Sequence, residues 1–166
     1  MAAPIINMVT TSSTTSPPTY WNPVTLNWEV TTTTKLDFGT LNIDANAWSA
    51  VKVVWAYVVD MGVGNSSIAS MGFYVDGTLV SGMTHYDSIE TTWVNPATHA
   101  NLTGASGLTS GTSHQVLESD GTNTMEAATD HSQYIYVQYY VLSSVSTGSK
   151  STGAGTGRPT FAYTYS

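Results

Sequence analysis

The segment from Tyr134 to Leu142 carries the pattern that most restricts the fold of this chain, because its side chains alternate with a period of two. Successive side chains of a β-strand point to opposite faces of a sheet, whereas a helix would scatter this pattern around its axis. We therefore predict a strand with two distinct faces. One face carries Ile135, Val137, Tyr139 and Val141, and the other carries Tyr134, Tyr136, Gln138 and Tyr140.

The stretch from Trp48 to Asp60 allows two interpretations. A helix would place Trp48, Val51 and Trp55 on one side. An unbroken period of two nevertheless runs from Val51 to Val59, and the valines of this stretch favour extended backbone. We predict a central strand with a buried face and a partly covered face. One face carries Val51, Val53, Trp55, Tyr57 and Val59, and the other carries Lys52, Val54, Ala56, Val58 and Asp60.

Shorter segments and turn residues complete the pattern. Asp76 and Gly77 predict a hairpin that returns through residues 78–80, and residues 125–128 are expected to form a single helical turn. Little helix and long polar loops predict an all-β fold, a two-sheet β-sandwich of jelly-roll or immunoglobulin-like topology. The shorter strands are predicted around residues 26–30, 71–75, 85–94, 115–117 and 161–165.

The composition agrees with a β-protein and excludes several partners. Only 9% of the residues are charged, while 41% are hydrophobic, so the chain is not expected to be disordered. The net charge is −7, and the only cations, Lys35, Lys52, Lys150 and Arg158, are dispersed. Nucleic acids and anionic membranes bind clustered cations, so neither is an expected partner. The absence of cysteine excludes disulfides and thiolate chemistry.

The first 23 residues differ in composition from the rest. Thr and Ser fill almost all positions from Thr10 to Ser16, and Pro17 and Pro18 then stiffen the chain. We predict an extended N-terminal arm over residues 1–23 and one β-sandwich domain over residues 24–166. Such an arm needs a surface that holds it, either its own domain or a neighbouring subunit. The first residues lack the features of a signal peptide, so synthesis in a cytoplasm is expected.

Side chains that could carry chemistry are sparse. His85, Asp87 and Glu90 form the densest titratable cluster, and residues 85 and 87 would share a strand face. A polar face explains this cluster better than a metal site, because no two histidines have metal-ligand spacing. Residues 120–126 are likewise interpreted as a turn rather than a calcium loop. Catalytic and phosphate-binding motifs do not occur, so we expect no enzymatic activity, no metal and no cofactor.

Several segments together resemble β-sandwich virion proteins of tailed bacteriophages. They are Asp37–Leu41, Trp48–Ser49, Lys52–Trp55, Met71–Val75, Tyr134–Val137 and Gly157–Tyr165. The resemblance covers roughly residues 25–166 and consists of strand patterning and turns. It implies a structural capsid decoration protein on the outer surface of the virion, synthesised in the host cytoplasm. Such a protein would stabilise the shell through oligomeric contacts and its N-terminal arm. Its partners would be further copies of itself, for example in a trimer, and a major capsid protein.

The alternative is a receptor- or carbohydrate-binding module of a phage tail or cell surface. Trp rings can stack on sugars, but most aromatic side chains of a β-sandwich lie in its core. We expect core packing and subunit contacts to account for most of the aromatic residues. The predicted partner-binding residues are Pro17, Pro18, Tyr20, Trp21, Tyr134, Tyr136 and Tyr140.

Overall fold

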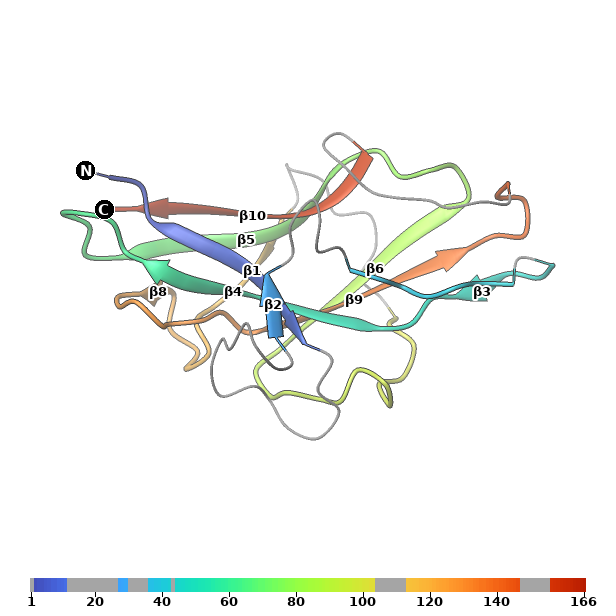
Figure 1. The fold of residues 1–166 in the computed structure, drawn as a ribbon, viewed down its shortest axis with the longest axis horizontal. Helices are drawn as coiled ribbons and strands as arrows, with labels where there is room; N and C mark the ends of the chain where they lie inside the picture. Colours follow the sequence, from blue (N-terminus) through green and yellow to red (C-terminus); the bar gives the residue numbers. More distant parts are fainter. Residues whose placement is uncertain (1, 12–26, 30–35, 43, 104–112, 147–155) are drawn as a thin grey trace.

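A computed structural model describes residues 2–11, 27–29, 36–42, 44–103, 113–146 and 156–166. The described residues form strands, turns and loops, and no helix. Two antiparallel sheets share an apolar core, as in a β-sandwich (Figure 1). The prediction of an all-β fold with two sheets is therefore confirmed.

The large sheet has six antiparallel strands. They are β1 (Ile5–Thr11), β2 (Asn27–Glu29), β3 (Ala47–Trp48), β4 (Lys52–Asp60), β6 (Met83–Glu90) and β9 (Tyr134–Val141). Their order is β2-β1-β4-β9-β3, and β6 pairs with the other edge of β9. The β6–β9 register is unbroken from Met83↔Val141 to Glu90↔Tyr134.

The small sheet has four strands. They are β5 (Ile68–Gly77), β7 (His114–Gln115), β8 (Thr124–Met125) and β10 (Thr156–Tyr165). Their order is β10-β5-β7, and β8 also pairs with β5. The strands predicted around residues 26–30, 71–75, 85–94, 115–117, 134–142 and 161–165 are all present, with bounds that differ by a few residues.

The two faces of β4 pack into different apolar clusters. Val54, Ala56 and Val58 are fully buried against the small sheet. Val53 and Trp55 of the other face belong to a second apolar cluster on the outer side of the large sheet. Alternation separates the two faces of a strand but does not say which one meets the second sheet.

A bulge in β5 adds a residue to this core. Met71, Phe73 and Val75 alternate as predicted, whereas Ile68 is out of phase with them. The backbone of Ser70 has a φ of 53°, and the register with β10 shifts between Ala162 and Thr164. The extra residue resets the alternation, so Ile68 is also buried in the core.

The hairpin predicted at Asp76 and Gly77 is wrong. β5 pairs with β10, β7 and β8, and residues 78–80 form no strand. Gly77 has a φ of 84°, which favours glycine, but the chain here leaves the small sheet and enters the large sheet as β6. A turn dipeptide specifies a local bend, not the strand that will pair.

The helical turn predicted over residues 125–128 is also wrong. Met125 ends strand β8. The Asp130 carboxylate then accepts hydrogen bonds from the backbone N–H groups of Glu126 and Ala127. These bonds close a turn that needs no helix, because the side chain supplies the acceptor.

The predicted N-terminal arm is not confirmed. Residues 5–11 form β1, which pairs with β4 from Ile5↔Asp60 to Thr10↔Val54, and Val9 is fully buried. This part of the predicted arm is therefore a strand of its own domain. Residues 12–23 lie outside the described residues. The apolar residues before Thr10 form most of this strand. The composition averaged over residues 1–23 does not reveal them, because the Thr- and Ser-rich run that follows dominates it.

Both ends of the chain lie at the same end of the molecule (Figure 1). The Ala2 N–H donates to the Val63 carbonyl, and Ser67 and Ser166 exchange two backbone hydrogen bonds of 3.1 and 3.2 Å. The loop between β4 and β5 therefore holds both ends. The described residues include no helix that could cross a membrane.

Candidate functional site

Two ionisable side chains of β6 point into the core between the sheets. His85 and Asp87 are each 1% exposed. The register of β6 on β9 places His85 opposite Tyr139 and Asp87 opposite Val137, on the face that meets the small sheet. The prediction that residues 85 and 87 share a face is confirmed. Glu90 falls on the opposite face, because it lies an odd number of positions away.

A third side chain, His114 of β7, extends this pair across the two sheets. Asp87 Oδ2 lies 2.9 Å from Nδ1 of His114, and Asp87 Oδ1 lies 3.4 Å from Nε2 of His85. The side chain of His114 is 42% exposed, whereas that of Asp87 is fully buried. The Asp87 carboxylate thus links an imidazole in the core to one that reaches the surface. A buried carboxylate depends on such a partner, because it has lost its hydration.

Four buried polar atoms of this region have no hydrogen-bond partner among the described residues. They are both ring nitrogens of His85, Oδ1 of Asp87 and the hydroxyl oxygen of Tyr139. The 3.4 Å contact between His85 Nε2 and Asp87 Oδ1 is therefore not a hydrogen bond. The Tyr139 ring packs on His85, with centroids 5.3 Å apart. We call His85, Asp87, His114 and Tyr139 the polar network. Unpaired buried groups lower the stability of a fold, so a gain in core stability does not account for the burial of this network.

The polar network does not have the shape of a metal site. Within the described residues, no group of three or more His, Cys, Asp or Glu side chains is placed to hold a metal ion. In the network, the two oxygens of Asp87 contact different imidazoles. In the segment 120–126, Asp120 Oδ1 accepts the N–H of Thr122 at 2.8 Å, which is the turn predicted there.

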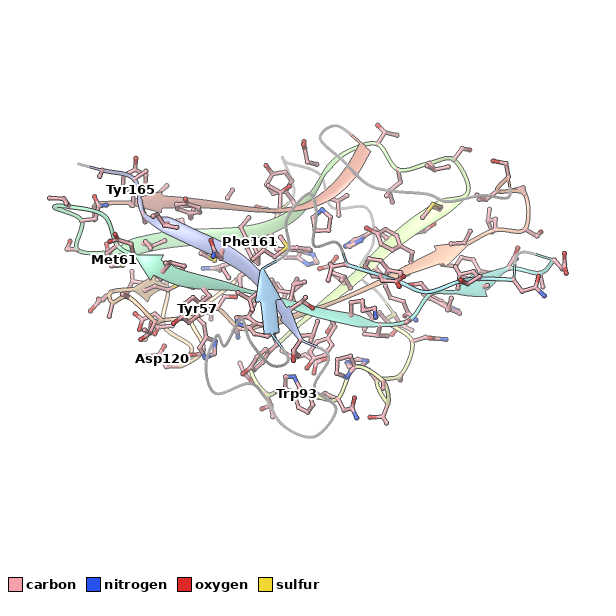
Figure 2. The ribbon with its side chains drawn as sticks, viewed as in Figure 1. Tyr57, Met61, Trp93, Asp120, Phe161 and Tyr165 are labelled. Carbon is pink, nitrogen blue, oxygen red and sulfur yellow. The ribbon has the colours of Figure 1, made fainter. Side chains whose placement is uncertain are left out.

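Residues 91–103 cover part of the outer face of the large sheet. Figure 2 shows Trp93 of this segment on the side of the large sheet away from β10. The Tyr136 hydroxyl donates to the Val94 carbonyl at 2.8 Å and accepts the Val94 N–H at 2.5 Å. His99 stacks on the Tyr136 ring, with centroids 4.6 Å apart, and its Nε2 lies 2.9 Å from Oε1 of Glu90. These contacts attach residues 91–103, which we call the covering segment, to β9 and β6.

Gln138 of β9 holds the far end of the covering segment. Its Oε1 accepts the N–H of Leu102 at 2.9 Å. Its Nε2 donates to the Ser49 carbonyl and to Oδ1 of Asn101, both at 2.8 Å. The buried amide of Gln138 therefore joins β9, the connection between β3 and β4, and residues 101–102.

A pocket of ≈ 380 Å³ opens beside Gln138 on this outer face. Its volume lies within the range of small-molecule sites, about 300–1,000 Å³. No carboxylate is among its described lining residues. The described lining consists of Thr11, residues 49–52, residues 95–97, His99, Asn101 and Gln138.

Three partly exposed aromatic side chains, which we call the aromatic cluster, adjoin this pocket. Trp48 of β3 lies with its ring centroid 4.9 Å from that of Tyr86 and 4.8 Å from that of Tyr140. Trp48 pairs with Tyr140, and Tyr86 pairs with Gln138 at the pocket. Trp48 also directly precedes Ser49 of the pocket lining. The cluster and the pocket are therefore neighbours on one surface.

Three tyrosines of β9 are predicted to bind a partner, which requires them to be accessible, and one of the three is. Tyr140 is partly exposed, whereas Tyr136 is fully buried and Tyr134 is 8% exposed. The covering segment explains the difference, because it lies over the half of β9 that carries Tyr134 and Tyr136. Pro17, Pro18, Tyr20 and Trp21 lie outside the described residues.

Sequence reasoning missed both His114 and the pocket. His114 stands 27 positions from Asp87 and belongs to the other sheet. The pocket combines residues from β1, β4, β9 and two connections. The one local signal was Gln138, a polar side chain in the middle of an aromatic strand face.

Comparisons with protein-family models, with curated proteins and with solved structures find no match to this chain. The candidate site is therefore interpreted from its own geometry.

The two buried tyrosine hydroxyls should respond in opposite ways to removal. Tyr136→Phe leaves the N–H and the carbonyl of Val94 without their partner, so we expect the free energy of unfolding to fall by about 1–3 kcal/mol. Tyr139→Phe removes a hydroxyl that has no partner among the described residues, so stability should be unchanged or rise. Urea unfolding of both variants measures the difference. A larger loss for Tyr139→Phe than for Tyr136→Phe would contradict the assigned contacts.

Alkaline pH should destabilise the fold through the same two residues. Burial raises the pKa of Tyr136 and of Tyr139 to about 12 from the ordinary 10.0. The unfolded chain loses these protons near pH 10.0 and the folded chain near pH 12, so stability is complete below pH 10.0 and falls as the pH rises toward 12. Urea unfolding across this range should show a shallower fall for Tyr139→Phe. Tyr165→Phe is the control, because that ring is exposed, and an equal effect of both changes would refute this account.

Removal of His114 should destabilise the protein more than its exposure suggests. His114→Ala leaves the buried Asp87 carboxylate without its hydrogen-bonded partner, and we expect a loss of about 3 kcal/mol at pH 7. The matched control is Gln115→Ala, the exposed neighbour on β7, which should change stability by less than about 0.5 kcal/mol. Thermal and urea unfolding measure both variants. Equal losses would show that Asp87 does not depend on His114.

Proposed function

We propose that this chain is a structural virion protein, a capsid decoration protein that stabilises a shell through contacts between copies of itself. The sequence resemblance to β-sandwich virion proteins of tailed bacteriophages supports the location. The observation that carries self-assembly is the edge of the small sheet, formed by β10.

Strand β10 has β5 as its one neighbour among the described strands. Soluble proteins protect such edges with charges, proline or short strands, because an open edge pairs with other chains. β10 runs for 10 residues, and its second half, Phe161–Tyr165, contains no charged residue and no proline. Ala162 and Tyr165 are exposed there. Pairing of this edge with a second copy would add strand hydrogen bonds and bury its aromatic side chains.

The remaining features are consistent with a mechanical role. A chain without cysteine gains no stability from disulfides, so assembly on a shell would supplement the core. The proposal includes no enzymatic activity and no cofactor, a homo-oligomer such as a trimer, and a major capsid protein as the second partner. It also retains a jelly-roll or immunoglobulin-like sandwich, because β4, β5 and β6 alternate between the sheets. The proposal assigns no role to an N-terminal arm, because residues 5–11 form β1 of the large sheet.

Charges on β10 should dissociate the oligomer. Ala162→Lys combined with Tyr165→Lys places two cations on the exposed edge strand, where like charges of two copies would repel. We expect the wild-type chain to be oligomeric and this variant to be monomeric in light scattering coupled to size-exclusion chromatography. Thr91→Lys combined with Thr92→Lys adds the same charge at exposed residues after β6 and should leave the oligomer intact. A monomeric wild-type chain, or an oligomeric β10 variant, would contradict assembly through this edge.

A further inference from the structure

The aromatic cluster and the pocket form a second surface, separate from the β10 edge. The cluster comes from β3, β6 and β9 of the large sheet, whereas β10 is the edge of the small sheet. Tyr140 alternates with the core-facing Tyr139 and Val141, so the cluster lies on the outer face of the large sheet. Any ligand of this surface would therefore bind without competing for the proposed assembly edge.

The polar side of this surface is held in place before any ligand arrives. Gln138 fixes Asn101 and the Ser49 backbone through its three hydrogen bonds. His99 is fixed by Glu90, by the Ala100 carbonyl at 2.8 Å and by the Tyr136 ring. Asn95 Oδ1 accepts the N–H of Ala97 at 2.9 Å. Binding to groups that are already ordered loses little conformational entropy, which favours a specific ligand.

Hydrogen-bond donors remain unused in this ordered pocket. Asn95 and Asn101 each use Oδ1 as an acceptor, and the amide nitrogen of neither has a partner among the described residues. Each amide nitrogen can donate two hydrogen bonds. Both asparagines line the pocket, and Asn95 is partly exposed and Asn101 exposed. The pocket thus offers neutral, directional donors beside the rings of the aromatic cluster.

We propose that the aromatic cluster and the pocket together bind a neutral polysaccharide. A pyranose ring has an apolar face, which packs on an aromatic ring, and a rim of hydroxyls, which bond to amides. One sugar unit would pack on Trp48 and Tyr140, and a neighbouring unit would place its hydroxyls near Asn95 and Asn101. The described lining holds no carboxylate that would select a cationic ligand, and its one lysine, Lys52, can donate hydrogen bonds to sugar hydroxyls. A second copy of the chain would match this surface less well, because subunit contacts have an apolar centre rather than an ordered polar hollow.

The test uses the full chain and defined sugars. An array of immobilised neutral glycans built from glucose, galactose and mannose identifies a polymer that binds, and tryptophan fluorescence titration then measures its affinity. We expect the polymer to bind more tightly than its free monosaccharide, because two neighbouring units contact the surface. Trp48→Ala should weaken binding at least about tenfold, since a central aromatic contact dominates such interfaces.

A second variant tests the donors without disturbing the fold. Asn95→Asp combined with Asn101→Asp keeps the Oδ1 acceptors that Ala97 and Gln138 use, and replaces each amide donor with a negatively charged carboxylate oxygen that cannot donate. We expect it to weaken binding about as strongly as Trp48→Ala while keeping the wild-type melting temperature. This variant also decides the question if Trp48→Ala fails to fold. Tyr74→Ala is the control, because Tyr74 is a partly exposed tyrosine of β5 in the other sheet.

Three results would overturn the polysaccharide site. They are no binding to any neutral glycan at millimolar concentration, binding that the double asparagine variant leaves unchanged, and equal weakening by Tyr74→Ala. If no glycan binds and Trp48→Ala instead dissociates an oligomer, the surface is a contact between copies. The lysine variants of β10 report on assembly separately, so failure of this site and failure of the proposed function are distinguishable.

Discussion

The burial of β9 on both faces is the constraint on which the rest of the structure depends. Seven of its eight residues are buried, and β4, β3 and β6 pair with its two edges. One face packs on the small sheet, and the other lies beneath residues 91–103. The register on β9 then decides which side chains of β6 enter the core. His85 and Asp87 are buried for that reason, although charged side chains are seldom buried without a partner.

The two ends of β9 lead to different surroundings. Toward Tyr134, the covering segment buries the aromatic side chains and uses the Tyr136 hydroxyl to hold itself in place. Toward Tyr140, the outer face stays partly open and carries the aromatic cluster. Gln138 stands between them and supplies the hydrogen bonds that end the covered region. Gln138 thus lies between the part of β9 that the covering segment buries and the part that stays open to a ligand.

Much of the fold could be predicted from alternation, but little of the candidate site. The strands at 52–60 and 134–141 were predictable, because period two is a local property of the sequence. The pairing of Asp87 with His114 was not, because it joins different sheets. The bulge at Ser70 was not either, since its effect depends on the register with β10. Of the three predicted partner-binding residues that the structure describes, Tyr140 is partly exposed and Tyr134 and Tyr136 are buried.

The sequence by itself determined that the chain is built from strands, which side chains share a strand face, and that clustered cations and cysteines are absent. These are properties of residue type and spacing, so they need no tertiary contact. The tertiary structure decided which face of β4 meets the second sheet, that β5 pairs with β10 rather than with residues 78–80, and that residues 5–11 join the large sheet. Each of these outcomes depends on hydrogen bonds and buried contacts between segments that are far apart in the sequence. A local sequence pattern does not specify which distant segments will pair.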